Sequence, residues 1–200
     1  MTRILAIETS TDACSVALMD NDLTITECFE LCPQQHTRKL LSQIEQVCRE
    51  QGVILSQIDA IAFGQGPGSF TGIRIGLTVA QALGFGLQKP LLPISTLRAI
   101  AQAAYEEKGY PRVAALLDAR LQSVYWGLYQ VNADGIMDAT QPEAVGPEDS
   151  IVLPTKDWVA VMGQYPHARV IAQLGAYDFL HHRAVDATMA IPQYVRDKVV

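Results

Sequence analysis

Short apolar runs separated by polar stretches mark the first hundred residues of the chain. The first two runs, residues 4–8 and 14–19, flank the polar stretch 9–12. Because strands on either side of a short polar turn usually pair, these runs predict a β-hairpin. The same pattern predicts further strands at residues 23–31, 59–63 and 90–94.

Longer segments with apolar residues three and four positions apart predict helices. Residues 37–51 form one of them, and Gly52 is placed to end it. Its apolar face is made by Leu40, Leu41, Ile44, Val47 and Cys48. Two more helices are predicted, at residues 71–87 and 95–108, the second capped by Ser95. This order of strands and helices predicts a mixed sheet flanked by helices.

The second half of the chain begins after a natural break at Gly109, Tyr110 and Pro111. It predicts strands at residues 113–117, 124–129 and 158–162, a loop over 132–147 and a helix over 171–183. We therefore expect two α/β subdomains, a clearer one over residues 1–105 and a smaller, divergent one over 106–200.

The stretch FGQGPGSFTGIRIG, residues 63–76, holds five glycines ahead of a predicted helix. It does not match the P-loop pattern, and it lacks the third glycine of G-x-G-x-x-G because Ser69 stands there. A helix N-terminus still favours an anion. The alternative is a tight strand-to-helix turn. The loop residues concerned are Gly64, Gly66, Pro67 and Gly68.

The helix after this loop carries small residues four positions apart: Gly72, Gly76, Ala80 and Gly84. The polar residues of this helix form a second, narrow stripe: Arg74, Thr78, Gln81 and Gln88, with Phe85 among them. Glycine inside a helix costs up to about 1 kcal/mol relative to alanine, so the small residues need a compensating contact. Close packing on the chain's own sheet and close packing against a partner's helix both supply one.

The first predicted hairpin places an acid and hydroxyl groups at its turn: Glu8, Thr9, Ser10, Thr11 and Asp12. Turn N–H groups and hydroxyls can wrap a phosphate, and an acid can hold a metal ion or water. The same residue types are also common turn formers. The hairpin alone therefore leaves both interpretations open.

Composition narrows the possible functions. A chain of 200 residues that is 49% hydrophobic can bury a substantial core, and its net charge of −6 argues against unaided binding to a nucleic-acid backbone. Neither a secretory signal nor the ~18-residue apolar run of a membrane span is evident. The four cysteines contain no C-x-x-C pair, so we expect reduced thiols and a cytoplasmic protein.

Five stretches, in this order, resemble the TsaB (YeaZ) family: ILAIETSTDACSVAL, HTRKLL, GQGPGSFTGIRIGLTVAQALG, PISTL and LLDARLQSVYWGLY. The resemblance covers residues 1 to about 130 and is highly specific. It implies an α/β protein of the actin-like ATPase (ribonuclease H-like) fold with two mixed-sheet subdomains. Asp118-Ala119-Arg120 belongs to the family signature, but its residues suggest only a buried or turn-stabilising ion pair.

The resemblance also implies a function. TsaB proteins are non-catalytic subunits of the machinery that forms threonylcarbamoyladenosine beside the anticodon of tRNAs reading A-starting codons. The implied partners are the catalytic paralogue TsaD and the ATPase TsaE, with tRNA bound only through the complex and a homodimer formed when the protein is alone. Subunits of this family join through N-terminal helices, which here implies an interface at Gly72, Gly76, Ala80, Leu83 and Gly84, with Leu40 and Ile44.

The resemblance implies no catalytic residue and no metal site. The catalytic paralogue carries an H-x-x-x-H pair after the strand equivalent to residues 90–94, where this chain reads STLRAI. No histidine occurs between His36 and His167, and His181 and His182 are adjacent, so two ligands do not share one helix face. Nucleotide binding is expected to be weak and vestigial, at residues 8–12. ATP or ADP at the assembled interface stays open.

Two other functions compete with this one. Relatives were once labelled glycoproteases, so a metallopeptidase is an alternative, but the chain has no zinc motif and no evident Cys–His or Ser–His spacing. The second alternative is a small-molecule kinase of the actin-like fold. Such an enzyme needs two full domains and a catalytic acid, and the chain is short for that.

Overall fold

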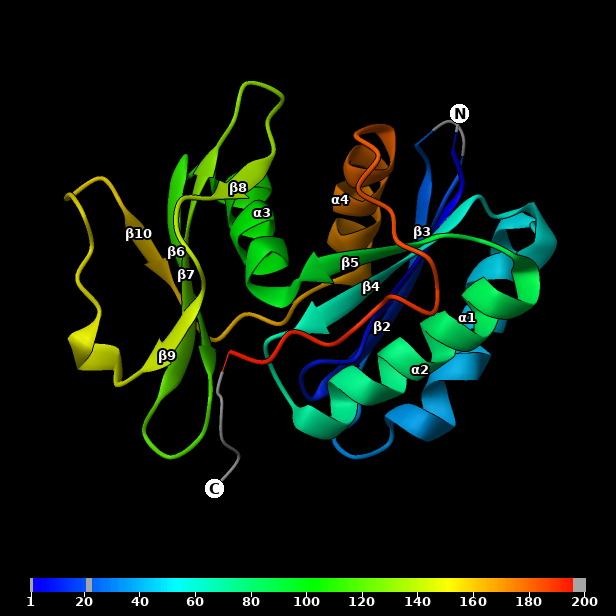
Figure 1. Cartoon of the computed structure of the whole chain (residues 1–200), viewed down its shortest axis with the longest axis horizontal. Helices are drawn as coiled ribbons and strands as arrows, with labels where there is room; N and C mark the ends of the chain where they lie inside the picture. The colour runs from blue at the N-terminus through cyan, green and yellow to red at the C-terminus, as the bar shows by residue number, and fades with distance from the viewer. Residues whose placement is uncertain (1, 21–22, 196–200) are drawn as a thin grey trace.

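The computed structural model describes residues 2–20 and 23–195. Two mixed sheets are separated by a layer of two helices, and two more helices cover the outer face of the first sheet (Figure 1). We call the first sheet with α1, α2 and α4 the first lobe, and the second sheet with α3 the second lobe. The predicted mixed-sheet α/β architecture is confirmed.

The first sheet has the strand order β3-β2-β1-β4-β5. Its first three strands form the predicted antiparallel meander, and β1, β4 and β5 are parallel. Strands β1 and β2 are buried along their whole length, because helices cover both faces. The bounds are β1 (Ile4–Glu8), β2 (Ala13–Met19), β3 (Ile25–Leu31), β4 (Ala60–Gly66) and β5 (Leu91–Ser95).

Helices α1 (His36–Gln51) and α2 (Phe70–Leu87) pack on the outer face of this sheet. Gly52 ends α1 in the left-handed conformation, as predicted, with φ of 65°. By length and composition α2 could span a membrane, but the core helix of a soluble protein meets the same criteria. Here α2 packs one face on the first sheet.

The second sheet has the order β10-β6-β7-β8, and β9 also pairs with β7. Helix α3 (Thr96–Lys108) covers its inner face and begins at the predicted Ser95 cap, whose hydroxyl accepts from the Arg98 amide. The strands are β6 (Arg112–Asp118), β7 (Val124–Val131), β8 (Met137–Ala139), β9 (Ala144–Gly146) and β10 (Val159–Val161). Two short 3₁₀ turns complete the fold, at Leu55–Gln57 and Glu148–Ser150.

The prediction of an unbroken loop over residues 132–147 is wrong, because β8 and β9 lie within it. Each of these strands has three residues, which is too short to show the period of a strand. They are held by hydrogen-bond pairing with the long strand β7.

Helix α4 (Ala168–Leu180) follows the second sheet in the chain but packs on the inner face of the first. The predicted boundary at residue 105 therefore separates the two sheets. It groups α4 with the second sheet, although α4 packs on the first. The first lobe supplies the caps of α4: the Ala168 amide donates to Ser15 Oγ at 3.0 Å, and the Arg169 amide to Glu27 at 3.1 Å. Burial opposes ionisation of Glu27, but hydrogen bonds from His167, the Arg169 amide and Ser15 outweigh it and lower its pKa.

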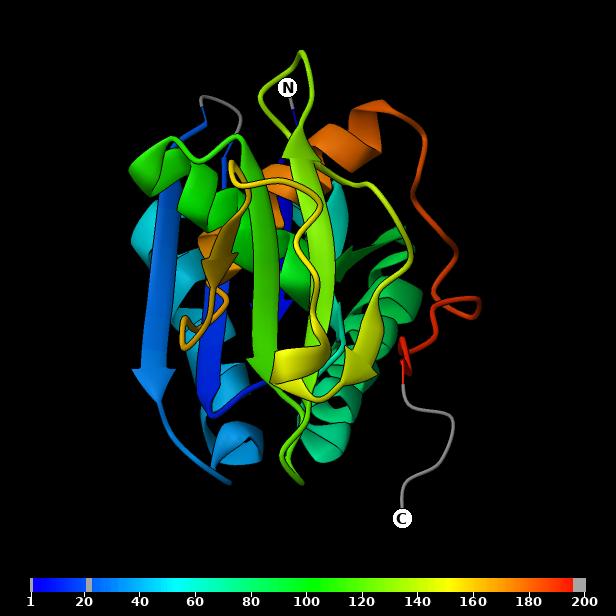
Figure 2. The same ribbon diagram turned by 90° about the vertical axis from the view of Figure 1, so that its left-hand side faces the viewer.

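The segment after α4 returns along the side of the molecule to the first lobe (Figure 2). Leu91 and Val185 exchange two backbone hydrogen bonds, and Gln81 donates to the Ala190 carbonyl. The four cysteines are free thiols, and burial raises the pKa of each, for Cys14 to about 12.

Candidate functional site

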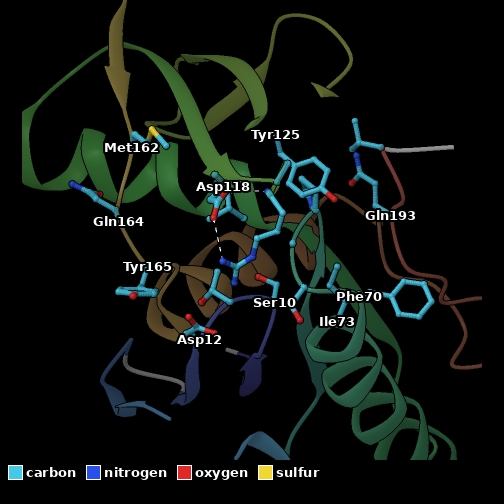
Figure 3. Close-up of a pocket in the computed structure, with 18 of the residues that line it drawn as sticks. Ser10, Asp12, Phe70, Ile73, Asp118, Tyr125, Met162, Gln164, Tyr165 and Gln193 are labelled. Atoms are coloured by element: carbon cyan, nitrogen blue, oxygen red, sulfur yellow. Dashed lines mark hydrogen bonds and ion pairs between the residues drawn. The ribbon is translucent and has the colours of Figure 1, made fainter. Parts of the chain in front are cut away.

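A cleft of about 670 Å³ lies between the two lobes. In Figure 3, Ser10, Asp12 and Ile73 lie on its first-lobe side, with Asp118 and Tyr125 across from them. The elements around it are the tip of the β1–β2 hairpin, the N-terminus of α2, the β6–β7 turn, residues 162–165 and residues 193–195. The fold thus brings together two features singled out in the sequence, the hairpin and the glycine-rich loop.

Only part of the predicted hairpin set faces this cleft. Ser10, Thr11 and Asp12 line it, whereas Glu8 and Thr9 are buried beneath it and turn toward the chain's own interior. The Thr9 hydroxyl donates to the Gly72 carbonyl at 2.8 Å, and Glu8 accepts from the Ser10 amide. The prediction that Glu8 and Thr9 bind nucleotide is therefore corrected: both side chains are used in packing the hairpin against β4 and α2.

Glu8 is an acid whose surroundings shift its pKa strongly. Its side chain is fully buried, and burial raises its pKa to about 7 against the opposing hydrogen bonds from Ser10 and Thr9. One of its carboxyl oxygens, Oε2, has no hydrogen-bond partner among the described residues. Glu8 is therefore a buried acid close to its midpoint at neutral pH.

The glycines of the loop and of α2 make room for this hairpin. A Cβ at Gly64 would overlap the Glu8 carboxyl group, and one at Gly68 the Ser10 carbonyl. A Cβ at Gly72 would overlap the Thr9 carbonyl, and one at Gly76 would lie 2.5 Å from Thr9 Oγ1. Close approach of Glu8 at the end of β1, and of Thr9 and Ser10 in the turn after it, therefore explains these glycines, while Gly66 supplies a positive φ of 103° beside Pro67.

The N-terminus of α2 is already occupied by groups of the chain. The Ser69 amide donates to the Ser10 carbonyl at 2.7 Å, and the Ser69 hydroxyl accepts from the Gly72 amide. Of the two interpretations of the loop, the structure supports the tight turn. The amides of Ser10, Ser69 and Gly72 are thus engaged within the chain, which disfavours a polyphosphate at this end of the cleft.

The β6–β7 turn carries the Asp118-Ala119-Arg120 signature into the cleft. Asp118 accepts from the Arg120 amide at 2.8 Å, and its carboxylate lies 3.5 Å from the Arg120 guanidinium. Both side chains are exposed, so the pair stabilises the turn and is not buried. Arg120, Leu121 and Gln122 all adopt positive φ, between 52° and 63°. With Asp12 and Asp118 both lining the cleft, Arg120 is its one lining cation among the described residues, which again disfavours a polyphosphate.

The small residues of the predicted α2 interface do not face outward. Gly72, Gly76, Ala80 and Gly84 are buried, and the added Cβ contacts of the three glycines are with the chain's own atoms. The assignment of this stripe to a partner's helix is therefore corrected, because its close contact is with the first sheet. Substitutions such as Gly76→Leu or Ala80→Arg would disturb the fold and do not test pairing.

The predicted α1 residues are corrected in the same way. Leu40 and Ile44 belong to the core beneath α1, with 1% and 4% of their surface exposed, whereas Leu83 of α2 is half-buried and stays a predicted interface residue. The exposed surface of the two helices is made by other apolar side chains. We call it the α1/α2 face: Leu41, Phe70, Ile75, Val79 and Phe85, with Arg74 and Thr78. The polar stripe of α2 in the sequence was the available signal for this exposed side.

A half-buried polar network joins the lobes beside the cleft. Glu143 accepts hydrogen bonds from Ser95, Tyr129 and Gln193, and Gln193 also pairs with Gln65. Burial raises the pKa of Glu143 and of Tyr129. Sequence reasoning missed this network, since its members are far apart in the chain and belong to no motif.

No metal-binding group stands out within residues 2–20 and 23–195: three or more His, Cys, Asp or Glu side chains do not converge on one point there. The expectation that the chain holds no metal stays a prediction.

Comparison with known proteins identifies what this chain is similar to. The family model of TsaD, tRNA N6-adenosine threonylcarbamoyltransferase, matches residues 30–197. The tRNA threonylcarbamoyladenosine biosynthesis protein TsaB of Escherichia coli K12 is 48% identical over 143 residues, which are 72% of this chain but only 62% of that protein. The TsaB of Buchnera aphidicola subsp. Schizaphis graminum is 35% identical, and the match covers 79% of this chain and 77% of that protein.

A solved structure described as YeaZ from Pseudomonas aeruginosa superposes with a TM-score of 0.92 at 39% identity, covering 97% of this chain and 100% of that one. Together with the TsaD family model, this match confirms the predicted actin-like ATPase fold.

Proposed function

The chain belongs to the TsaB family, and on that premise we propose that it is a non-catalytic subunit in the formation of threonylcarbamoyladenosine on tRNA. In this role it pairs in the cytoplasm with a tRNA N6-adenosine threonylcarbamoyltransferase, the catalytic subunit TsaD. The ATPase TsaE engages that pair, and tRNA contacts this chain only through the complex. When the partner is absent, the chain pairs with itself.

One observation carries the proposal of a pairing subunit: the exposed apolar α1/α2 face. Leu41, Phe70 and Phe85 are 63%, 49% and 75% exposed, and they share two adjacent helices of one lobe. Apolar side chains gathered on one surface are typical of a protein–protein contact. The interface implied by the family resemblance thus moves from the inner stripe of α2 to its outer side.

The residues in and beneath the cleft favour a non-catalytic role of the chain over a catalytic one. The cleft is lined by Asp12, Asp118 and Arg120, and Glu8 is buried beneath the hairpin, outside this lining. This set contains no histidine or cysteine beside an activating base, as a hydrolase of the peptidase type requires. The chemistry is therefore assigned to the partner.

Reconstitution tests the proposal. Threonylcarbamoyladenosine formation is measured with purified catalytic subunit, TsaE, threonylcarbamoyl-adenylate and tRNA, with and without this chain. We expect modification to require the chain. An equal rate without it would refute the proposed role.

The interface is tested by placing a charge on the α1/α2 face. Thr78 is exposed and lines a groove of that face, so Thr78→Arg should leave the monomer folded and weaken co-purification with the catalytic subunit at least tenfold. Val152→Arg is the matched control, because Val152 is 81% exposed in the second lobe. If both variants bind the catalytic subunit like wild type, the contact lies elsewhere.

A further inference from the structure

Resting on the pairing proposed above, we infer that Arg74 selects the partner: it receives a carboxylate that a non-identical chain supplies and that α2 of a second copy of this chain does not. The groove on the α1/α2 face has a volume of about 370 Å³ and is lined by the first turn of α1 and the first half of α2. Ile75, Val79 and Phe70 make it apolar, and Arg74 is the one charged side chain that lines it within the described chain.

Arg74 is held in place without an ionic partner. Its guanidinium carbon lies 3.3 Å from the centroid of the Phe70 ring and 5.4 Å from that of Tyr194. No carboxylate of the described residues lies within ion-pairing distance of it, as is also the case for Arg38 and Arg49, whereas Arg3, Arg98, Arg112 and Arg169 all have such partners. A guanidinium stacked on a ring still presents its N–H donors at its edge, where a carboxylate binds them in pairs.

The surroundings of Arg74 reinforce the preference for an anion. Neither α1 nor α2 has an acidic residue in its first turn, and the N-cap of α1 makes no side-chain hydrogen bond. Helix α2 has no Asp or Glu along its whole length, in a chain of net charge −6. The groove is thus a local cationic region on an acidic protein, and Coulomb attraction favours a partner's acidic side chain there.

The same features identify the occupant. An apolar helix with one acidic residue matches the groove in both polarity and charge. A second copy offers its own α2, which brings another Arg74 and no carboxylate. The exposed acids of α1, Glu45 and Glu50, lie two turns or more beyond Thr37, the α1 residue that lines the groove. Arg74 therefore favours the partner over the identical chain, because self-pairing lacks this ion pair.

The test compares two affinities of one variant. The full chain and Arg74→Met, which keeps an apolar side chain over Phe70, are titrated with the catalytic subunit by calorimetry at 50 and 500 mM NaCl. Self-association of each is measured by sedimentation equilibrium. Arg49→Met, an exposed cation in the last turn of α1, is the matched control.

We expect Arg74→Met to raise the Kd for the catalytic subunit about tenfold at low salt and to lose most of the salt dependence. Self-association should stay equal or become tighter, and Arg49→Met should behave like wild type. Equal weakening of both kinds of pairing would show that Arg74 only packs, and would overturn the inference. If Thr78→Arg abolishes pairing while Arg74→Met leaves the affinity unchanged, the result supports the interface and refutes the role of Arg74. If neither variant changes the affinity, the proposed interface itself is refuted.

Discussion

At the scale of single residues, Glu8 explains more of the site than any other side chain. It ends β1, turns inward and occupies the space above Gly64, while its carboxyl group accepts from the Ser10 amide. The hairpin turn that looked like a phosphate loop is therefore shaped from inside by a buried acid. A buried carboxyl group favours its neutral form, which links this residue to pH.

Replacing Glu8 with glutamine should change the pH dependence of folding. The native pKa of about 7 lies above the ordinary value of 4.5, so the folded state binds more protons than the unfolded state between these values. Stability contributed by this group is thus full below pH 4.5 and lost as pH rises through 7, by an amount on the order of 3 kcal/mol. Glutamine cannot ionise, so the loss disappears.

The measurement is the free energy of urea unfolding of wild type and Glu8→Gln from pH 5 to pH 8. The variant should gain on the wild type from pH 5 to about pH 7, and the difference should level off towards pH 8, whatever the offset at pH 5. Burial also raises the pKa of Glu143, but this group is present in both proteins and cancels in the difference. Parallel profiles would show that Glu8 is ionised throughout.

At the scale of elements, α2 contains glycines with opposite roles. Gly72 abuts the Thr9 carbonyl, a backbone atom that cannot move aside, whereas nothing lies within 4 Å of a Cβ added at Gly86. Replacing each of these two glycines with alanine should therefore change the free energy of unfolding in opposite directions. We expect Gly72→Ala to lower the free energy of unfolding by about 2 kcal/mol through overpacking. Gly86→Ala should raise it by about 0.5 kcal/mol through helix propensity.

Urea unfolding of the two variants under one buffer condition measures this contrast. Each variant is the other's control, since both place alanine in the same helix. If Gly72→Ala were neutral or stabilising, the close approach of β1 to α2 would not be the reason for the glycine stripe.

The elements themselves were largely predictable, since hydrophobic period alone placed β1, α1, α2 and β6 to within one residue or so. The hydrophobic pattern did not specify which element packs against each helix. A stripe of small residues such as Gly72 and Gly76 has the same form whether β1 of the same chain or a partner's helix approaches it. Likewise, the apolar period of α4 does not reveal which sheet it covers; Ser15 and Glu27, more than a hundred residues earlier, supply its caps.

At the scale of the whole molecule, the two lobes are joined by more than the chain passing between them. The Gln193 amide and side chain both bind Gln65 of the first lobe, and its side-chain amide also donates to Glu143 of the second at 2.9 Å. Glu143 in turn holds Ser95 and Tyr129. One side chain near the C-terminal end of the described chain thus bridges both lobes beside the cleft.

Gln193→Ala should therefore loosen the second lobe at β9, next to Glu143. The variant removes the side-chain hydrogen bonds and leaves the half-buried Glu143 carboxyl group with one donor fewer, which we expect to cost about 1–2 kcal/mol. Amide hydrogen exchange over residues 144–146 should become roughly tenfold faster, because local opening follows that free energy. Exchange in α1, which packs on the far side of the first sheet, should not change.

Gln46→Ala is the matched control, because the Gln46 amide bonds only Glu50 of its own helix and the side chain is exposed. Wild-type exchange at β9 in Gln193→Ala would mean that Ser95 and Tyr129 hold Glu143 without help, and that the lobes are fixed by α3 and α4 alone. Faster exchange at β9 would instead show that the C-terminal segment sets how firmly the second lobe is held. Because Tyr194 follows Gln193 and packs against Phe70, the same segment would then connect the α1/α2 face to the second lobe.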